Sequence, residues 1–245
     1  LGGLPVPYAD PQDRFRPGFE MPEDFLRSMW LSYQGEIRYA DECVGRLLAS
    51  LDELGLRDET VVVLLSDHGE SFEKGFYFAH GNRLFDSLVH VALMFRFPGR
   101  IEPGRTDVQV QLADLHPTLL SLAGAVPDTS LQGPDVFARG GGPDAPVFLQ
   151  TDFGNTRPHS SRVSLGVRLP GWKYVDSPEL GVVELYDLEA DPGELVELSG
   201  ERPDETLEMA ATLMRWLEET EHRDAPAEEL TPERAEALRA LGYLQ

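Results

Sequence analysis

Two stretches of the chain decide the expected fold: TVVVLLSDHGE at Thr60–Glu70 and FAHGNRLFD at Phe78–Asp86. In the first, an uninterrupted apolar run stops at Ser66 and is followed by Asp67 and His68. Such a run predicts a strand buried on both faces, which is typical of parallel sheets covered by helices. Open α/β sheets bind ligands beyond the carboxyl ends of their strands. The sequence therefore predicts a site at the end of this strand.

Asp67 and His68 are the first candidate site residues. A carboxylate and an imidazole on one turn can both face a divalent cation. The alternative is that Asp67 caps the following turn and His68 is an ordinary polar residue. His80 lies twelve residues further on, and its small neighbours Ala79 and Gly81 let its ring approach a ligand. The alternative for His80 is a loop histidine with one backbone hydrogen bond.

Other ionisable residues carry weaker signals. Glu70 and Glu73 are candidate acceptors for an imidazole N–H, or they are merely solvated. His90 lies in an apolar run and is expected to be a structural group inside a strand. The remaining histidines, expected at the surface or at caps, are His116, His159 and His222. The chain has no phosphate-binding loop, dinucleotide fingerprint, paired-cysteine motif or nucleophile elbow.

Composition narrows the possible functions. The 245 residues carry 43 acidic and 21 basic side chains, a formal net charge of −22. This charge argues against nucleic acid as a partner, because phosphate backbones require Lys and Arg; it predicts a solvated acidic surface. The single cysteine, Cys43, excludes an intrachain disulfide and is expected to be buried in a helix. No apolar run reaches the roughly 18 residues needed for a transmembrane helix.

Hydrophobic periodicity predicts the elements of the first half. Residues 1–24 are expected to be a loop, and residues 25–54 a helix whose apolar stripe includes Ile37, Val44 and Leu47. Strands are predicted at 60–66 and 89–97. A further helix, 114–123, is expected to have Asp114 as its N-cap and Pro117 in its first turn.

The second half shows a different pattern. Short strands follow one another without helices between them, which predicts an antiparallel sheet: 147–151, 162–169, 172–176 and 183–187. An amphipathic helix around 207–217 is expected to cover it. The predicted parts are 1–140, an α/β domain portion; 141–223, a small antiparallel sheet plus helix; and 224–245, a helical tail.

These segments together resemble the C-terminal portion of sulfatases of the alkaline phosphatase superfamily. The resemblance rests on the DHGE strand end, the AHGNRLFDSLVHVALMFRFPG segment, VQLADLHPTLLSLAG, and GWKY followed by ELYDLEADPGE. The tail ELTPERAEALRALGYL also resembles the ends of bacterial sulfatase-like proteins. The resemblance covers nearly the whole chain in the same order.

The resemblance implies an alkaline-phosphatase-like α/β fold, partly present here. Its sheet is mixed, mainly parallel and flanked by helices, and a small antiparallel β plus helix subdomain follows. One divalent cation would be held by four side chains, two of them Asp67 and His68, with the other two upstream. The nucleophile is also expected upstream: formylglycine in a C/S-x-P-x-R motif in sulfatases, or Thr in phosphoglycerol and phosphoethanolamine transferases. Neither motif occurs here, so we expect a fragment that is inactive alone.

The resemblance also gives His80 a catalytic and substrate-binding role, because the family places a Lys or His there that contacts the transferred group and protonates the leaving oxygen. Glu70 is expected to accept a hydrogen bond from an imidazole N–H. Two residues depart from the family pattern: Lys74 stands where a His is frequent, and Ala92 where a Pro is frequent. Neither departure affects the metal pair.

The implied function is hydrolysis of sulfate esters, on a small molecule or a glycan. The alternatives are a phosphodiesterase, a phosphonate monoester hydrolase, one of the two transferases acting on phosphate esters, or a non-catalytic fragment. Ca²⁺ ranks first as the cation because calcium sulfatases with an Asp-His pair exist, although a His ligand also suits Mn²⁺; Mg²⁺ and Zn²⁺ remain open. Family habit favours the periplasm or secretion.

Overall fold

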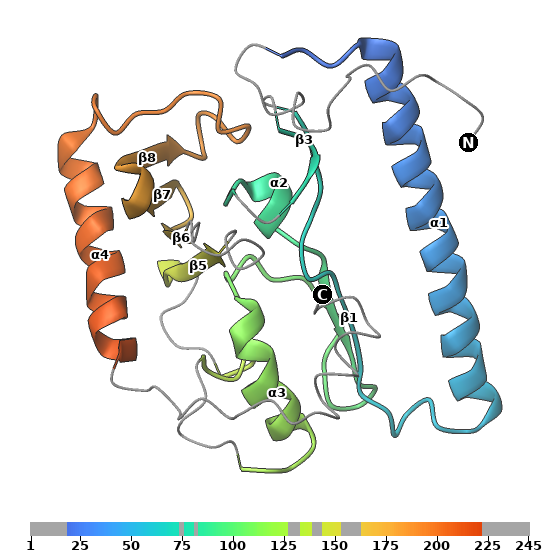
Figure 1. The fold of residues 1–245 in the computed structure, drawn as a ribbon. Coiled ribbons are helices and arrows are strands. Elements are labelled where there is room, and N and C mark those ends of the chain that lie inside the picture. Colours follow the sequence, from blue (N-terminus) through green and yellow to red (C-terminus); the bar gives the residue numbers. More distant parts are fainter. Residues whose placement is uncertain are drawn as a thin grey trace, which may run out of the picture.

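The computed structural model describes residues 19–73, 76–80, 83–126, 133–138, 144–152 and 163–221. A long helix stands at one side, a four-stranded sheet with its own helix lies at the other, and shorter elements fill the space between (Figure 1). In chain order the elements before residue 130 are α1 Glu23–Glu53, β1 Val62–Leu65, β2 Ser71–Glu73, β3 Phe76–Ala79, α2 Asp86–Val89, β4 Leu93–Arg96 and α3 Leu115–Leu122. Those after residue 140 are β5 Val147–Asp152, β6 Val163–Arg168, β7 Trp172–Ser177, β8 Val182–Asp187 and α4 Pro203–Glu221.

The strand that precedes Asp67 is β1, and it pairs with β4 in antiparallel register, with Leu64 opposite Met94. The expected parallel neighbours are not among the described strands, whose pairings are all antiparallel. Leu64, Leu65 and Met94 are all exposed. The apolar run that predicts burial on both faces therefore lies in a ribbon that the described part of the chain leaves partly uncovered.

Helix α1 agrees with the predicted helix 25–54 to within two residues, but its burial differs from the expectation. None of its residues is buried, and its stripe residues Ile37 and Leu47 are exposed. Cys43 is half-buried, and Arg46 Nη2 donates to its Sγ at 3.0 Å. The prediction of a buried thiol is wrong because no described element covers this part of the stripe.

Two elements were not predicted: the β2–β3 hairpin and the single-turn helix α2. The hairpin packs against the first turns of α1 through aromatic rings. The Phe72 ring lies 4.9 Å from Trp30 and 5.2 Å from Tyr33, and Phe25 lies 5.9 Å from Phe78, as centroid distances. These contacts fix the hairpin that immediately precedes His80.

The strand predicted over 89–97 begins only at Leu93. Residues 86–89 form α2, and His90 is its C-cap and is exposed. The prediction of His90 as a structural group within a strand is therefore wrong. Four apolar residues around a histidine fit a helical turn as well as a strand, and the contacts of α2 described below favour the helix.

Helix α3 confirms the predicted helix 114–123, with a different role for Asp114. A 3₁₀ turn, Leu112–Asp114, precedes the helix. The Asp114 carboxylate accepts the Gln111 N–H at 3.0 Å and makes no capping bond to α3. Pro117 lies buried in the first turns of the helix. His116, on the same helix, is exposed as expected.

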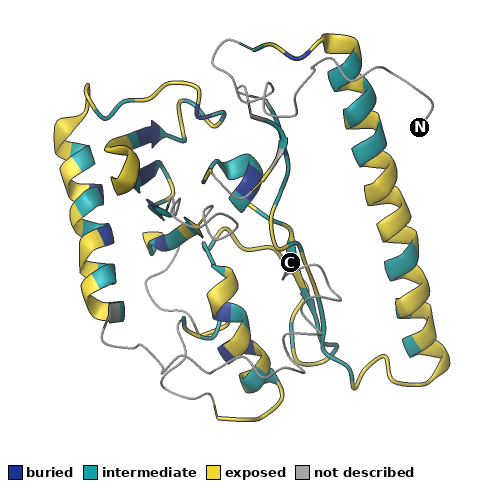
Figure 2. Cartoon of the chain, viewed as in Figure 1, coloured by how far each residue is buried: buried dark blue, intermediate teal, exposed yellow. Residues whose placement is uncertain are grey.

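The second half agrees closely with the prediction. Strands β5, β6, β7 and β8 form one antiparallel sheet in sequence order, and α4 covers one of its faces (Figure 1). Leu213 and Met209 of α4 pack on Val167, Tyr174 and Leu185 of the sheet, all nearly inaccessible to solvent. The Phe148 ring also stacks on Trp216, with centroids 4.5 Å apart. This layer is the hydrophobic core of the described chain (Figure 2).

The opposite face of this sheet turns toward α2. Because side chains alternate along a strand, Tyr174 faces α4 whereas Lys173 and Val175 face α2. Gly166 of β6 lies on the same side, where a Cβ atom would meet Leu84 at 3.2 Å. The sheet therefore has an apolar face against α4 and a polar face against the segment that follows His80.

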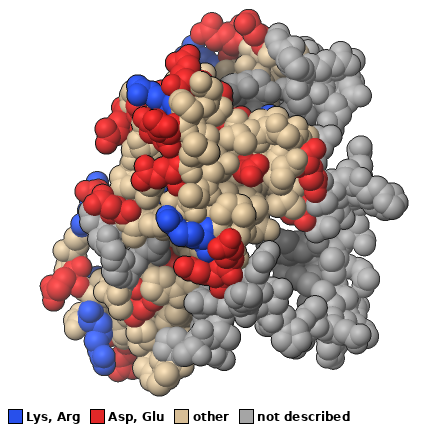
Figure 3. Space-filling model, turned by 90° about the vertical axis from the view of Figure 1, so that its left-hand side faces the viewer, with Lys and Arg blue, Asp and Glu red and all other residues tan. Residues whose placement is uncertain are grey.

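Several expectations concern residues outside the described ranges: the loop at 1–18, Lys74, His159, His222, the boundary at 140–141 and the tail 224–245. The division into three parts stays a prediction. Among the described helices, none combines the length and the apolar character that a membrane span requires. Acidic side chains are spread over the face that carries α4, as the net charge of −22 suggests (Figure 3).

Candidate functional site

The turn after β1 is held by hydrogen bonds on both sides. Ser66 N–H donates to Ala92 O at 3.2 Å, which extends the β1–β4 ladder, and Ser66 Oγ donates to His68 O at 2.6 Å. Gly69 N–H donates to Leu88 O of α2 at 2.7 Å. A Cβ atom on Gly69 would lie 2.1 Å from the Ser87 carbonyl oxygen. Only glycine permits this close approach, so the turn and α2 form one packed unit.

Asp67 and His68 project from this turn with their polar atoms close together. Asp67 Oδ1 lies 3.9 Å from His68 Nε2, and the same oxygen accepts the His68 backbone N–H at 2.9 Å. His68 Nδ1 lies 2.8 Å from Gly69 O. Because a carbonyl oxygen only accepts, Nδ1 carries a hydrogen, and in the neutral ring Nε2 keeps its lone pair. The Asp67 bond is to the N–H of the next residue and not to the residue two positions on, as a turn cap would be.

His80 joins this pair from β3 and stacks on His68. The two rings have centroids 4.0 Å apart and planes inclined by 17°. His80 Nδ1 lies 3.3 Å from Glu70 Oε2, so the carboxylate accepts the Nδ1 hydrogen. Glu70 is the most buried of the four, with a side chain 24% exposed, against 74% for Asp67. The fold thus brings together all four candidates: Asp67, His68, Glu70 and His80.

The donor set fits half of a metal site. Two ligands that each lie about 2.3–2.6 Å from one cation can be separated by up to about 5 Å. The 3.9 Å between Asp67 Oδ1 and His68 Nε2 meets this condition. A metal-bound imidazole usually donates its other N–H to an acceptor, as Nδ1 does here to Gly69 O. Within the described ranges, no cluster of three or more His, Cys, Asp or Glu side chains suits a metal ion, so these residues supply two donors.

A group of buried charges, which the sequence interpretation missed, lies on the other side of α2. Arg168 of β6 donates to the Asp86 carboxylate at 3.0 Å, and Lys173 of β7 bonds the same carboxylate and Glu194. Burial alone would raise the pKa of Asp86, but Lys173 and Arg168 outweigh it and hold that pKa below its ordinary value of 3.8. The available signal was the acidic and basic residues interrupting apolar runs at 86, 168 and 173.

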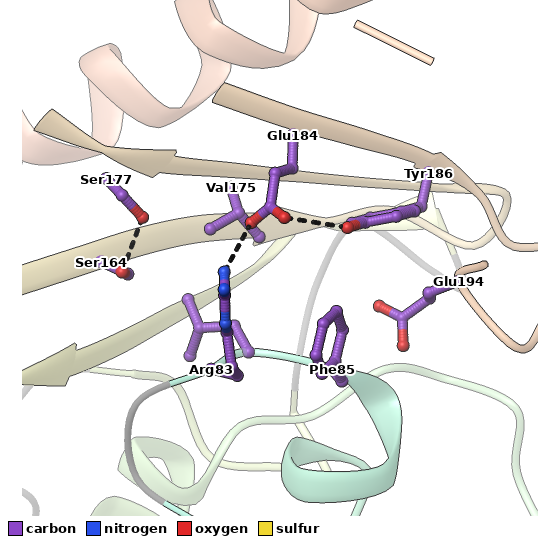
Figure 4. A pocket seen from close by; sticks show the side chains of 9 residues that line it. Arg83, Phe85, Ser164, Val175, Ser177, Glu184, Tyr186 and Glu194 are labelled. Atoms are coloured by element: carbon purple, nitrogen blue, oxygen red, sulfur yellow. Dashed lines mark hydrogen bonds and ion pairs between the residues drawn. The ribbon is translucent and has the colours of Figure 1, made fainter. Parts of the chain in front are cut away.

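A small polar cavity lies between residues 83–85 and this sheet (Figure 4). Arg83 pairs with Glu184 at 3.6 Å, and the Tyr186 hydroxyl donates to Glu184 at 3.0 Å. Burial raises the pKa of Tyr186, and the nearby Glu184 charge adds to this, so the phenol stays protonated. The cavity volume of about 10 Å³ holds about one water molecule and no sugar. The residues around the cavity therefore join residues 83–85 to the sheet, and the cavity itself is too small for a substrate.

The chain has an α/β fold, and an oxygen and a nitrogen donor of the kind that bind metal ions lie at the end of a strand. Comparisons with known proteins agree with this description. The family model described as "Sulfatase" matches residues 4–125, and the model described as "N-sulphoglucosamine sulphohydrolase, C-terminal" matches residues 73–223. The second match covers more than half of the 245 residues. The chain belongs to the sulfatase family of the alkaline phosphatase superfamily.

Similar curated proteins are sulfatases. A choline-sulfatase of Rhizobium meliloti (strain 1021) is 29% identical over 81% of this chain and 40% of its own length. Arylsulfatase K of Xenopus laevis is 28% identical over 76% of this chain and 37% of its own. Human iduronate 2-sulfatase is 36% identical over 42% of this chain and 23% of its own. The chain thus spans less than half the length of the curated relatives it matches.

Solved structures give the same fold. A putative sulfatase from Bacteroides thetaiotaomicron VPI-5482 aligns with a TM-score of 0.70 at 22% identity, over 83% of this chain and 45% of its own. The phosphonate monoester hydrolase of Silicibacter pomeroyi aligns with a TM-score of 0.71 at 21% identity, over 89% and 46%. The protein BT4656, solved with its substrate D-glucosamine-2-N,6-O-disulfate, aligns with a TM-score of 0.64 at 24% identity, over 76% and 39%. The alkaline-phosphatase-like α/β class is confirmed.

Proposed function

We propose that this chain is part of a metal-dependent sulfuric ester hydrolase, in which Asp67 and His68 hold one divalent cation and His80 contacts the transferred sulfuryl group. The observation that carries the proposal is the stack of His80 on His68, with centroids 4.0 Å apart, beside the Asp67 carboxylate. Residues from the end of one strand and from a separate hairpin thereby meet at one point.

The chain's own residues have separate roles in this proposal. Asp67 and His68 offer an oxygen and a nitrogen donor on the same side of a turn. Glu70 accepts the Nδ1 hydrogen of His80 and fixes its ring. When the ring is protonated at both nitrogens, the Nε2 hydrogen passes to the leaving-group oxygen. Cleavage of the ester S–O bond places negative charge on that oxygen, and a positioned acid is typically worth about 10²–10⁴-fold in rate.

The cation and the nucleophile come to this proposal from the family. A bound divalent cation neutralises charge on the sulfuryl oxygens and activates the nucleophile. We propose Ca²⁺ first, with Mn²⁺, Mg²⁺ and Zn²⁺ as alternatives, and formylglycine as the nucleophile, outside these 245 residues. Asp67 and His68 would supply two of the four ligands.

The proposed substrate is a sulfate ester of a small molecule or a glycan. Relatives named for choline sulfate and iduronate sulfate, and a structural neighbour solved with a disulfated glucosamine, support this class. The net charge of −22 disfavours a long polyanion, which favours a compact sulfate ester. A second candidate, phosphonate monoester hydrolysis, is supported by the neighbour with a TM-score of 0.71.

Hydrolysis assays on the product of the complete reading frame test the proposal. We expect turnover of 4-nitrophenyl sulfate at a higher kcat/KM than that of a 4-nitrophenyl phosphonate monoester. The reverse ratio favours the second candidate, and turnover of neither ester contradicts both. Replacement of His80 by Gln is expected to lower kcat about 10²–10⁴-fold. The matched control is His116→Gln, an exposed imidazole on α3, which should leave kcat unchanged.

Calorimetric titration tests the half-site directly. The 245-residue chain with two donors should bind Ca²⁺ or Mn²⁺ only weakly, because a stable site for either ion needs further ligands. Submicromolar binding by this chain would contradict the proposal that Asp67 and His68 are only two of the four ligands. Loss of the cation from the complete protein with a chelator should abolish hydrolysis, and added Ca²⁺ or Mn²⁺ should restore it.

A further inference from the structure

Lys173 is a fully buried cation on the face of the sheet that turns toward α2. Its side chain is 0% exposed, and its Nζ donates to Leu84 O at 3.0 Å, to Glu194 Oε1 at 2.8 Å and to the Asp86 carboxylate. Three acceptors match the three hydrogens of an ammonium group. A buried charge with all of its hydrogens bonded specifies one geometry, and removing one member leaves the others buried without compensation.

Glu194 also bonds Asp86, the first residue of α2. Its Oε2 accepts the Asp86 backbone N–H at 2.7 Å, while its Oε1 accepts from Lys173. Its backbone has a φ of 51°, in the left-handed region that residues with a Cβ rarely adopt. Arg168 bonds the Asp86 carboxylate from β6 through Nε and Nη2. Side chains from β6, β7 and the loop after β8 therefore fix the start of this short helix.

The other end of α2 contacts the turn that carries Asp67 and His68. Leu88 O accepts the Gly69 N–H at 2.7 Å, and Ser87 O leaves no room for a side chain on Gly69. Gly69 directly follows His68, whose Nδ1 bonds the Gly69 carbonyl at 2.8 Å. Each step from the sheet to the turn is thus a direct contact, through Lys173, α2, Gly69 and His68.

We propose that Lys173 is a positioning residue for the candidate site: by fixing α2 from the C-terminal sheet, it holds the turn that carries Asp67 and His68. The C-terminal subdomain then contributes to the site without touching the reacting atoms. This assignment rests on the proposed function only for what the positioned residues do; the positioning itself is a property of the fold.

The test compares amide hydrogen exchange at Gly69 with exchange at Val167, a buried residue of β6. Lys173→Met alone leaves the Glu194 carboxylate buried without its cation. The test therefore uses the double variant K173M/E194Q, which removes both charges and retains the Arg168–Asp86 pair. In this variant we expect Gly69 exchange to rise at least about tenfold more than Val167 exchange. The stacking contact between the His68 and His80 rings, seen as a nuclear Overhauser effect, should weaken in parallel.

The control is Leu213→Ala, which opens the core under α4 on the opposite face of the sheet. In L213A, Val167 exchange should rise at least as much as Gly69 exchange. If K173M/E194Q leaves the Gly69 to Val167 ratio at the wild-type value, or if L213A shifts that ratio equally, the proposal is overturned. In the complete enzyme, K173M/E194Q should lower kcat with little change in KM. If the proposed function is wrong, only the kcat measurement is lost. The ratio of Gly69 to Val167 exchange still tests whether Lys173 positions the turn.

Discussion

Gly69 is the residue at which the site turn and α2 come closest together. The free space around it is set by a backbone carbonyl, that of Ser87, which cannot rotate away as a side chain can. The close approach is what lets the Gly69 N–H reach Leu88 O at 2.7 Å. A local sequence of Asp-His-Gly-Glu indicates a turn, but the requirement for glycine comes from a contact with a segment about twenty residues away.

Replacement of Gly69 by Ala should therefore destabilise the chain. The added Cβ forces the turn and α2 apart, and overpacking of this kind costs about 1–3 kcal/mol in free energy of unfolding. The matched control is Gly45→Ala in α1, where a Cβ atom meets nothing within 4 Å. That change should stabilise the helix by up to about 1 kcal/mol. Urea unfolding of both variants checks the prediction, which is wrong if G69A is as stable as wild type.

At the scale of elements, α2 is short and depends on the charges around its first residue. The charges of Lys173 and Arg168 lower the pKa of Asp86 in the folded state, against its burial. A carboxyl group with a lowered folded pKa stabilises the fold above its unfolded pKa of about 3.8, and this contribution is lost as the pH falls through the folded value. The stabilisation is thus present at pH 7 and disappears in acid.

Asp86→Asn should lower the free energy of unfolding by about 3 kcal/mol at pH 7, since it removes one partner of a buried ion pair. The difference between wild type and D86N should shrink as the pH falls below about 4. Denaturant unfolding at pH 7, 5 and 3 measures this difference. A difference that stays constant down to pH 3 would show that the Asp86 charge does not contribute to the stability.

The sequence predicts some elements of this fold and misses others. The helix at 25–54, the helix at 114–123 and the four C-terminal strands follow from periodicity, because each has a long enough pattern of one period. The strands β2 and β3 and the helix α2 were missed because each has only three or four residues. The ladder between β1 and β4 is antiparallel, and strand direction depends on which segment pairs with which. An apolar run carries no information about the direction of the neighbouring strand.

The candidate site also has a part that the sequence predicts and a part that it does not. The strand end places Asp67 and His68 on one turn, as predicted from the local pattern. The stack between His68 and His80, and the Glu70 bond to His80, arise from the hairpin that returns the chain to the turn. Lys173 and Glu194 lie in segments that support the family resemblance, but the sequence predicted no site role for them or for Arg168. Their contacts with Asp86 span 87, 108 and 82 residues, and contacts over such separations leave no periodic signal.

At the scale of the whole molecule, burial is concentrated in the C-terminal half (Figure 2). The ribbon formed by β1 and β4 keeps Leu64, Leu65 and Met94 exposed, whereas Leu185 and Val167 have no accessible surface. A chain that spans less than half the length of its relatives can have a core in one half and an uncovered apolar ribbon in the other. The two halves should therefore respond differently to the same kind of substitution.

Met94→Ala should change the free energy of unfolding of this chain by less than about 0.5 kcal/mol, because Met94 is 56% exposed. Leu185→Ala, which removes a fully buried side chain of the sheet, should cost about 2–5 kcal/mol. Thermal unfolding of the two variants measures the contrast. Equal losses would show that the ribbon is covered in solution, for instance by self-association, which sedimentation would then detect.

The long helix α1 has a mechanical consequence. Its 31 residues extend about 46 Å, yet the aromatic contacts to the hairpin come from Phe25, Trp30 and Tyr33, near its beginning. An isolated helical segment is marginally stable in water, so turns far from the anchoring rings open first. Brief trypsin treatment should therefore cleave after Arg46 while the α4 layer is still intact. The nicked chain would keep its C-terminal core, but residues 47–53 would no longer be part of a continuous helix.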